Sequence, residues 1–90
     1  MPARTVAVAS RSGLHARPAS LFTQAAADSG LDVTIAHGEG EPVDAASILL
    51  VMSLGVPHGD EVTLAAEGED ADRILDELVT LLATDLDEEH

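Results

Sequence analysis

The feature that most constrains this fold is a regular alternation between short strand patterns and apolar stripes at helical spacing. Two stripes are clear, one beginning at Arg17 and one near the C-terminus. Their apolar members are Pro18, Leu21, Phe22, Ala25 and Ala26, and then Ala71, Ile74, Leu75, Leu78 and Leu82. Each stripe must be buried against another layer, so neither helix folds as an isolated element.

Four segments have the short, alternating or β-branched character of strands. They are Thr5–Ala9, Leu31–Ile35, Glu41–Val43 and Glu61–Ala66, and Pro42 restricts the third to a sheet edge. With a short helix predicted over Ser47–Leu54, the order becomes β-α-β-β-α-β-α. The natural solution is an α+β domain of two layers, with an antiparallel sheet and three helices on one face.

Turn and cap residues divide the chain between these elements. Ser29 and Gly30 are expected to end the first helix, with Gly30 just beyond it, and His37–Gly40 is expected to form a turn. Asp70 and Asp72 fall in the first turn of the last helix, where its dipole favours anions. We expect residues 1–90 to form one domain whose acidic tail, Asp85–His90, frays.

Charge and composition exclude several functions. The chain has 17 acidic and 4 basic residues, a net charge of −13, no lysine and no cysteine, which argues against nucleic acid, anionic membranes and disulfides. We expect a cytoplasmic protein without membrane insertion, cofactor or metal. Arg4, Arg11 and Arg17 lie in the first 17 residues, whereas 15 acids follow position 36, so positive charge is expected near His15.

His15 is the main candidate for chemistry. It immediately precedes a predicted helix N-terminus, where unpaired backbone N–H groups bind anions and the dipole favours neutral, nucleophilic imidazole. A phosphoryl group on that ring would meet the backbone of Ala16 and Arg17 and the guanidinium of Arg17. An ordinary loop or capping histidine is the alternative. No nucleotide-binding motif accompanies it.

The segment Gly13-Leu14-His15-Ala16-Arg17-Pro18-Ala19 resembles the signature of HPr, the histidine-containing phosphocarrier family of the bacterial phosphoenolpyruvate-dependent sugar phosphotransferase system. The segment Ser47–Val56 resembles the family's second motif, and the likeness extends over essentially the whole chain. The resemblance implies an open-faced sandwich. It also implies phosphorylation of His15 on Nδ1 by enzyme I and transfer to a histidine of enzyme IIA, with Arg17 stabilising the phosphate.

The segment Ser47–Leu54 is apolar almost all round. If Leu50, Val51 and Leu54 face the sheet, the side chains left outward are Ile48, Leu49 and Met52. Such an aliphatic patch suits docking of a partner protein, and in the resembled family this helix lies beside the active histidine. The alternative is that these residues fill the core because aromatic residues are scarce.

Ser47 is a plausible N-cap for that helix, with Asp44 as a competing cap. In some Gram-positive members of the resembled family the matching serine is phosphorylated by an ATP-dependent kinase. Ser47 is therefore either a regulatory site, served by a serine kinase and phosphatase, or a plain cap. Leu50 and Ala46 depart from the family's usual residues here.

The other histidines, His37, His58 and His90, show no metal-ligand spacing and are expected in turns or the tail. The sequence predicts a monomeric carrier with partners at both ends rather than a stand-alone enzyme. Two alternatives remain open. One is a carrier in a regulatory branch, such as nitrogen control or dihydroxyacetone phosphorylation, and the other is a Ser47-phosphorylated regulator of transcription.

Overall fold

The computed structural model describes residues 2–10, 13–14 and 16–84. His15, Arg11 and the predicted tail Asp85–His90 lie outside these residues. The elements follow the predicted order: β1 (Ala3–Ala7), α1 (Ala16–Asp28), β2 (Val33–His37), β3 (Val43–Asp44), α2 (Ile48–Ser53), β4 (Glu61–Ala66) and α3 (Ala71–Leu82).

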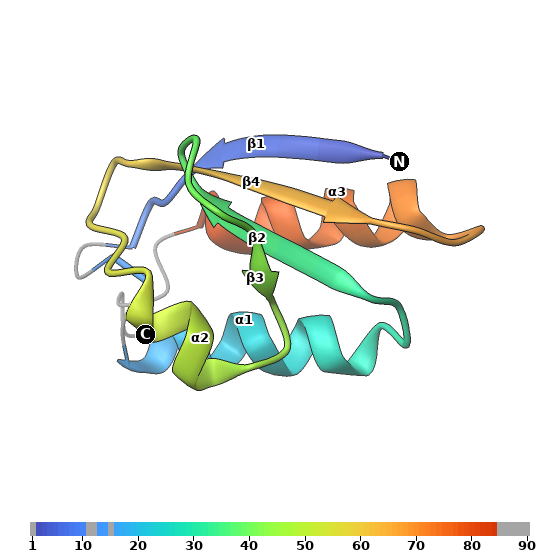
Figure 1. The fold of residues 1–90 in the computed structure, drawn as a ribbon, viewed down its shortest axis with the longest axis horizontal. Helices are drawn as coiled ribbons and strands as arrows, with labels where there is room; N and C mark the ends of the chain where they lie inside the picture. The colour runs from blue at the N-terminus through green and yellow to red at the C-terminus, as the bar shows by residue number, and fades with distance from the viewer. Residues whose placement is uncertain (1, 11–12, 15, 85–90) are drawn as a thin grey trace.

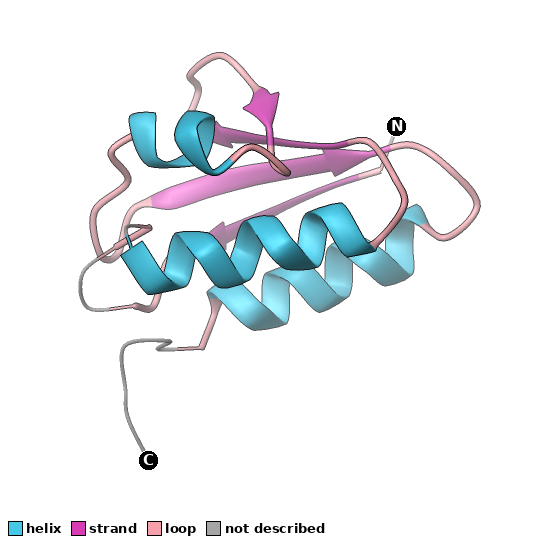
Figure 2. Cartoon of the chain, turned by 90° about the horizontal axis from the view of Figure 1, so that it is seen from below, coloured by secondary structure: helices cyan, strands magenta, loops and turns pink. Residues whose placement is uncertain are grey.

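The strands form one antiparallel sheet in the order β1-β4-β2-β3. All three helices lie on the same side of it, with α1 and α3 side by side beneath the strands and α2 beside α1 (Figures 1 and 2). Among the described residues, no helix lies on the opposite face of the sheet. The predicted α+β open-faced sandwich is therefore confirmed.

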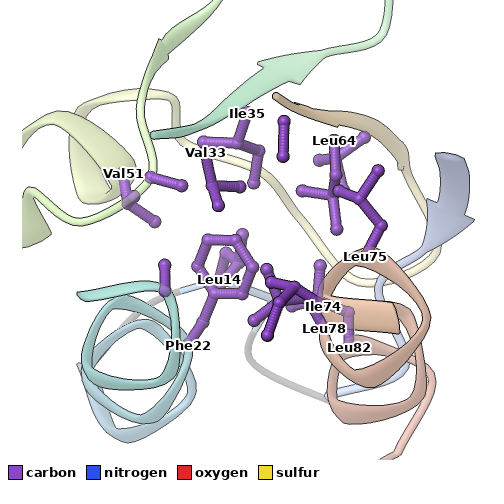
Figure 3. Packing of buried hydrophobic residues seen from close by; sticks show 14 of the residues in the cluster. Leu14, Phe22, Val33, Ile35, Val51, Leu64, Ile74, Leu75, Leu78 and Leu82 are labelled. Carbon is purple, nitrogen blue, oxygen red and sulfur yellow. The ribbon is translucent and has the colours of Figure 1, made fainter. Parts of the chain in front are cut away.

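Apolar and polar residues alternate along the strands, so the sheet has one apolar face, and this face packs against the helices. Val62, Leu64 and Ala66 of β4 are fully buried, while the intervening residues face away. Figure 3 shows Phe22 and Leu14 filling the space between α1 and the sheet, with the leucines of α3 beside them. Phe22, the only aromatic residue, has no exposed surface, so it provides the largest single block of the core.

The first strand begins two residues earlier than Thr5 and ends at Ala7. Directly beyond it, the N–H of Val8 donates to the carbonyl of Asp60 before β4, and the next N–H, that of Ala9, donates to the carbonyl of Leu82 at the end of α3. At its start, Arg4 pairs with Leu64 and its side chain lies on the helix side of the sheet. A polar residue facing inward breaks the apolar alternation, which is why the sequence pattern missed this end.

The second and third strands are also displaced from their predicted positions. β2 runs from Val33 to His37, so His37 lies in the strand rather than in the predicted turn, opposite Val62. β3 is limited to Val43 and Asp44, whereas Glu41–Val43 was expected. Pro42 has no N–H to contribute to the ladder, so pairing begins only after it.

The helix boundaries agree closely with the sequence pattern. α1 ends at Asp28, and Gly30 has the positive φ of 76° expected just beyond a helix. α3 begins after Asp70, whose side chain makes no capping hydrogen bond, and contains Asp72 in its first turn. In the described part of the chain, every helix is too short or too polar to cross a membrane.

Candidate phosphoryl-transfer site

The chain approaching position 15 is fastened to the turn that precedes β4. The N–H of Leu14 donates to the carbonyl of Val56 at 2.9 Å, and the N–H of Gly13 donates to the carbonyl of Ser10 at 2.9 Å. Leu14 itself is fully buried in the core. The backbone on the N-terminal side of position 15 is therefore held by hydrogen bonds and by core packing together.

The backbone at position 13 accommodates only glycine without strain. Its φ is +75°, and a Cβ built on it would lie 2.2 Å from the Val56 carbonyl oxygen and 2.9 Å from Cα of Pro57. Any larger residue would therefore combine an unfavourable backbone conformation with a clash against main-chain atoms. The glycine of the sequence motif allows this close approach of two loops.

On the other side of position 15, the first turn of α1 begins at Ala16. The N–H groups of this turn have no partner within the helix, so the backbone of Ala16 and Arg17 offers donors to an anion. Pro18 and Ala19 are buried, whereas Arg17 is exposed. Within the described residues, the side chain of Arg17 makes no ion pair.

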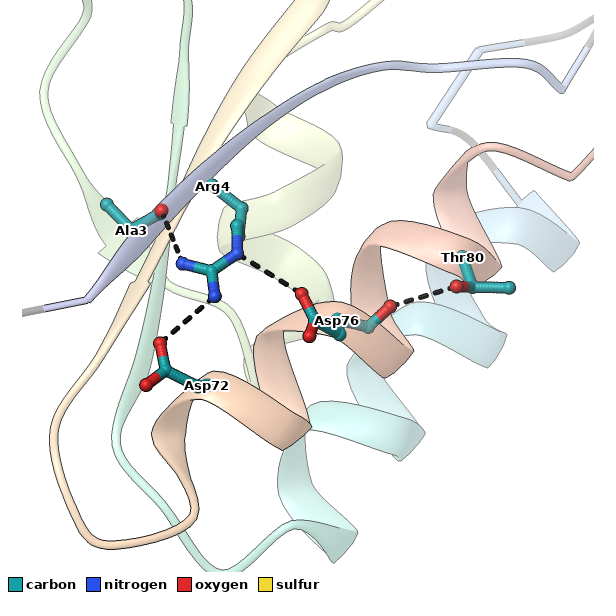
Figure 4. Close-up of polar contacts among 5 residues, drawn as sticks. All are labelled: Ala3, Arg4, Asp72, Asp76 and Thr80. Carbon is teal, nitrogen blue, oxygen red and sulfur yellow. Dashed lines mark hydrogen bonds and ion pairs between the residues drawn. The ribbon is translucent and has the colours of Figure 1, made fainter.

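Arg4 does not join this site, contrary to the expectation that the early arginines gather near His15. Its guanidinium donates to Asp72 at 3.0 Å, to Asp76 at 3.2 Å and to the carbonyl of Ala3 at 2.9 Å (Figure 4). The hydrogen bond to Asp72, and to a lesser extent the one to Asp76, raises the pKa of the Arg4 guanidinium above its ordinary value. Arg4 therefore ties β1 to α3.

The start of α2 settles the choice between two predicted caps. Ser47 is the N-cap, and its hydroxyl accepts from the N–H of Leu50 at 3.4 Å. The carboxylate of Asp44 instead accepts from the N–H of Ala46 at 2.9 Å, which fixes the turn before the helix. The Ser47 hydroxyl is thus already engaged with the helix backbone.

The outward face of α2 is larger than predicted. Ile48, Leu49 and Met52 are exposed as expected, but Leu50 was expected against the sheet and is 42% exposed. Val51 alone among the α2 residues is buried, with Leu54 partly buried one turn later. Successive side chains of an α-helix point about 100° apart around the helix axis. Since Val51 points into the core, the preceding residue Leu50 points to the side of the helix and remains partly exposed.

One contact between the end of β2 and the turn before β4 does not follow from the sequence pattern. His37 Nε2 lies 2.8 Å from Asp60 Oδ2, so the end of β2 is linked to the turn before β4. The two residues are 23 positions apart, and only the β2–β4 register brings them together. Within the described residues, no group of three or more histidine or acidic side chains is placed to hold a metal ion.

Comparison with known proteins identifies this arrangement. Residues 2–84 match the family described as "PTS HPr component phosphorylation site". The chain belongs to the HPr family. The HPr phosphocarrier protein of Streptomyces coelicolor is 48% identical over 88 residues, covering 98% of this chain and 95% of that protein. The HPr of Haloferax volcanii is 48% identical over 82 residues, covering 90% and 92%.

Solved HPr structures have the same fold. HPr-C-His of Thermoanaerobacter tengcongensis superimposes with a TM-score of 0.89 at 38% identity, and all of both chains is covered. HPr of Bacillus anthracis gives a TM-score of 0.84 at 37% identity, with 90% of this chain and 95% of that chain covered. This chain is a phosphocarrier of the phosphotransferase system.

Proposed function

We propose that His15 is the phosphorylated residue and that it accepts its phosphoryl group from enzyme I, which is charged by phosphoenolpyruvate, and passes it to a histidine of enzyme IIA. The supporting observation is the motif Gly13–Ala19 in a chain of this family, because the last four residues of the motif form the first turn of α1. The carrier works as a monomer in the cytoplasm, where it meets both partners.

In each transfer, a neutral imidazole nitrogen attacks phosphorus. On loading, the new P–N bond forms at Nδ1 of His15 while the bond to the histidine of enzyme I breaks. On delivery, the P–N bond at His15 breaks while a new one forms on the histidine of enzyme IIA, so the group passes between similar nitrogens without hydrolysis. Arg17 compensates the charge on the transferring oxygens, and the N–H groups of Ala16 and Arg17 cradle them. The chain needs no cofactor for this exchange.

Docking of both partners is assigned to α2. Ile48, Leu49 and Met52 are exposed on that helix, and α2 packs against α1, which begins at Ala16 next to the proposed phosphohistidine. Ser47 is a candidate for phosphorylation by a serine kinase and removal by a phosphatase. A phosphate there would add negative charge beside the apolar patch and oppose docking.

A two-step transfer assay tests this function. Incubation with phosphoenolpyruvate and enzyme I should load an acid-labile phosphoryl group, and the purified loaded chain should then transfer it to an enzyme IIA without enzyme I present. His15→Ala should abolish loading while retaining the thermal unfolding transition. Loading of His15→Ala to the wild-type level would exclude His15. Comparing sugar-specific with regulatory enzyme IIA proteins as acceptors would separate the two branches.

A further inference from the structure

His37 and Asp60 lie on the helix side of the sheet, at the end where β1 and β2 finish and β4 begins (Figure 1). Val33 and Ile35 of β2 are buried against the helices, and His37 follows with the same two-residue period. Asp60 comes two residues before the buried Val62, which lies opposite His37 in the register. The two side chains are therefore diagonal neighbours, and Nε2–H of His37 donates to the Asp60 carboxylate at 2.8 Å.

The turn before β4 is hydrogen-bonded to the segment between β1 and position 15 at two places. Near β1, the N–H of Val8 donates to the carbonyl of Asp60 at 3.0 Å, and the N–H of Gly59 donates to the carbonyl of Val8 at 2.9 Å. Next to position 15, the N–H of Leu14 donates to the carbonyl of Val56. The segment that leads to the proposed phosphohistidine is therefore held at both of its described ends by one turn.

Asp60 also closes this turn on itself. Its N–H donates to the carbonyl of Pro57 at 3.2 Å, and Pro57 is the residue against which Gly13 packs closely. Among hydrogen bonds between described residues, the only one made by a side chain of this turn is that of Asp60 with His37. His37 is therefore the side chain that ties the turn, and with it the approach to position 15, to the inner strand β2.

We propose that His37 and Asp60 are a positioning pair for phosphoryl transfer, in which their hydrogen bond holds the turn before β4 and so fixes the backbone at Leu14. This inference rests on the proposed function. The pair acts through the Leu14–Val56 hydrogen bond and does not contact the transferred group. The two side chains are 33% and 48% exposed, so the bond contributes little to global stability. Its effect falls on the alignment of the nucleophile, to which the rate of the chemical step is sensitive.

Three variants isolate the hydrogen bond. His37→Phe keeps a ring in the strand but has no nitrogen to donate, whereas His37→Gln keeps an N–H donor that can reach the Asp60 carboxylate. Thr63→Val is the matched control. It removes the 3.3 Å hydrogen bond between the hydroxyls of Thr5 and Thr63 in the same sheet, on the face turned away from the helices.

Amide hydrogen exchange of Leu14 measures the coupling directly, without any partner protein. His37→Phe should speed exchange of the Leu14 N–H about tenfold and leave that of Leu64, in the centre of β4, within about twofold of the wild type. His37→Gln and Thr63→Val should leave both amides within about twofold. An unchanged Leu14, or equal acceleration of Leu14 and Leu64, would overturn the inference, since the second result means only a global loss of stability.

The rate of loading tests the consequence for transfer. Rapid-quench single turnovers with excess phosphorylated enzyme I, at varied concentration, give a maximum rate and a half-saturating concentration. His37→Phe and Asp60→Ala should each lower the maximum rate about fivefold or more and change half-saturation less than about twofold. The double variant should be no slower than the slower single variant, because both remove the same bond. His37→Gln should load within about twofold of the wild type.

The outcomes separate this inference from the proposed function. If the wild type is loaded on His15 and His37→Phe reaches the same maximum rate, the positioning role is wrong and the proposed function stands. A change in half-saturation alone would assign the pair to docking and would also overturn the inference. A wild-type protein that enzyme I does not load would contradict the proposed function, whereas Leu14 exchange would still show whether the pair fixes this backbone.

Discussion

The N–H of Leu14 donates a 2.9 Å hydrogen bond to the carbonyl of Val56, and this bond joins the loop before the proposed phosphohistidine to the turn before β4. Leu14 is fully buried, and so is Val56. The chain that leads to position 15, the proposed acceptor of the phosphoryl group, is therefore anchored in the core. A phosphocarrier benefits from such an anchor because its nucleophile must present one geometry to two partners.

The contact between these loops predicts the effect of enlarging Gly13. Gly13→Ala adds a Cβ against Val56 and Pro57 at a φ of +75°, so we expect a loss of about 3 kcal/mol in the free energy of unfolding, measured by urea denaturation. Gly30→Ala is the matched control, because Gly30 has a φ of +76° but no atom within 4 Å of a new Cβ. It should cost only about 1 kcal/mol. Equal losses in the two variants would show that the Gly13 contact is unimportant.

Arg4 gives a second prediction, because it links β1 to Asp72 and Asp76 of α3. Arg4→Gln should lower the melting temperature modestly in low salt, and the difference from wild type should shrink as salt screens these exposed pairs. The pKa of Arg4 is raised, so its contribution is fully present below the ordinary arginine pKa and is lost only as pH rises through the raised value. The effect of the substitution should therefore be flat across neutral pH. A double-mutant cycle with Asp72→Asn tests whether the pair is coupled.

The excess of acidic residues predicts a salt dependence of folding. Seventeen acids against four basic residues leave a net repulsion in the compact state that counterions reduce. The melting temperature of the wild type should therefore rise between about 10 mM and about 300 mM NaCl, with KCl giving the same curve. A melting temperature that falls with salt would mean that ion pairs such as Arg4–Asp72 outweigh the repulsion.

Much of this architecture follows from the sequence. The helical stripes predicted α1 and α3 closely, and strict alternation placed β4 at Glu61–Ala66. The predictions failed where long-range contacts decide the structure. Arg4 faces inward because acids of α3 receive it, and the pairing of His37 with Asp60 depends on sheet register.

The same distinction applies to the candidate site: its local features could be predicted from the sequence, and its long-range contacts could not. The motif around His15 is local in sequence, so it could be recognised directly, together with Arg17 and the helix N-terminus. The orientation of Leu50 could not be predicted, because all sides of α2 are apolar and only the packing of Val51 shows which side is buried. The close approach of Gly13 to Val56 likewise requires two segments that are distant in the chain.

Arg17 should matter to transfer far more than the acidic tail. Arg17→Glu places a carboxylate where the phosphoryl oxygens are proposed to lie, so the initial rate of enzyme I-dependent phosphorylation should fall about a hundredfold. Deletion of Asp85–His90 changes net charge more but should alter the rate by less than about twofold. Comparable losses in these two variants would refute a local role for Arg17.

The central claim is that His15 itself holds the phosphoryl group, and site-mapped mass spectrometry after incubation with phosphoenolpyruvate and enzyme I tests it most directly. Peptides should be prepared at neutral to alkaline pH, because phosphohistidine is labile in acid. The account predicts one added phosphoryl group, located on the peptide that contains His15, and its complete absence from His15→Ala. A phosphoryl group mapped to His37 or His58, or a wild-type protein that stays unmodified while a known HPr is loaded in parallel, would contradict it.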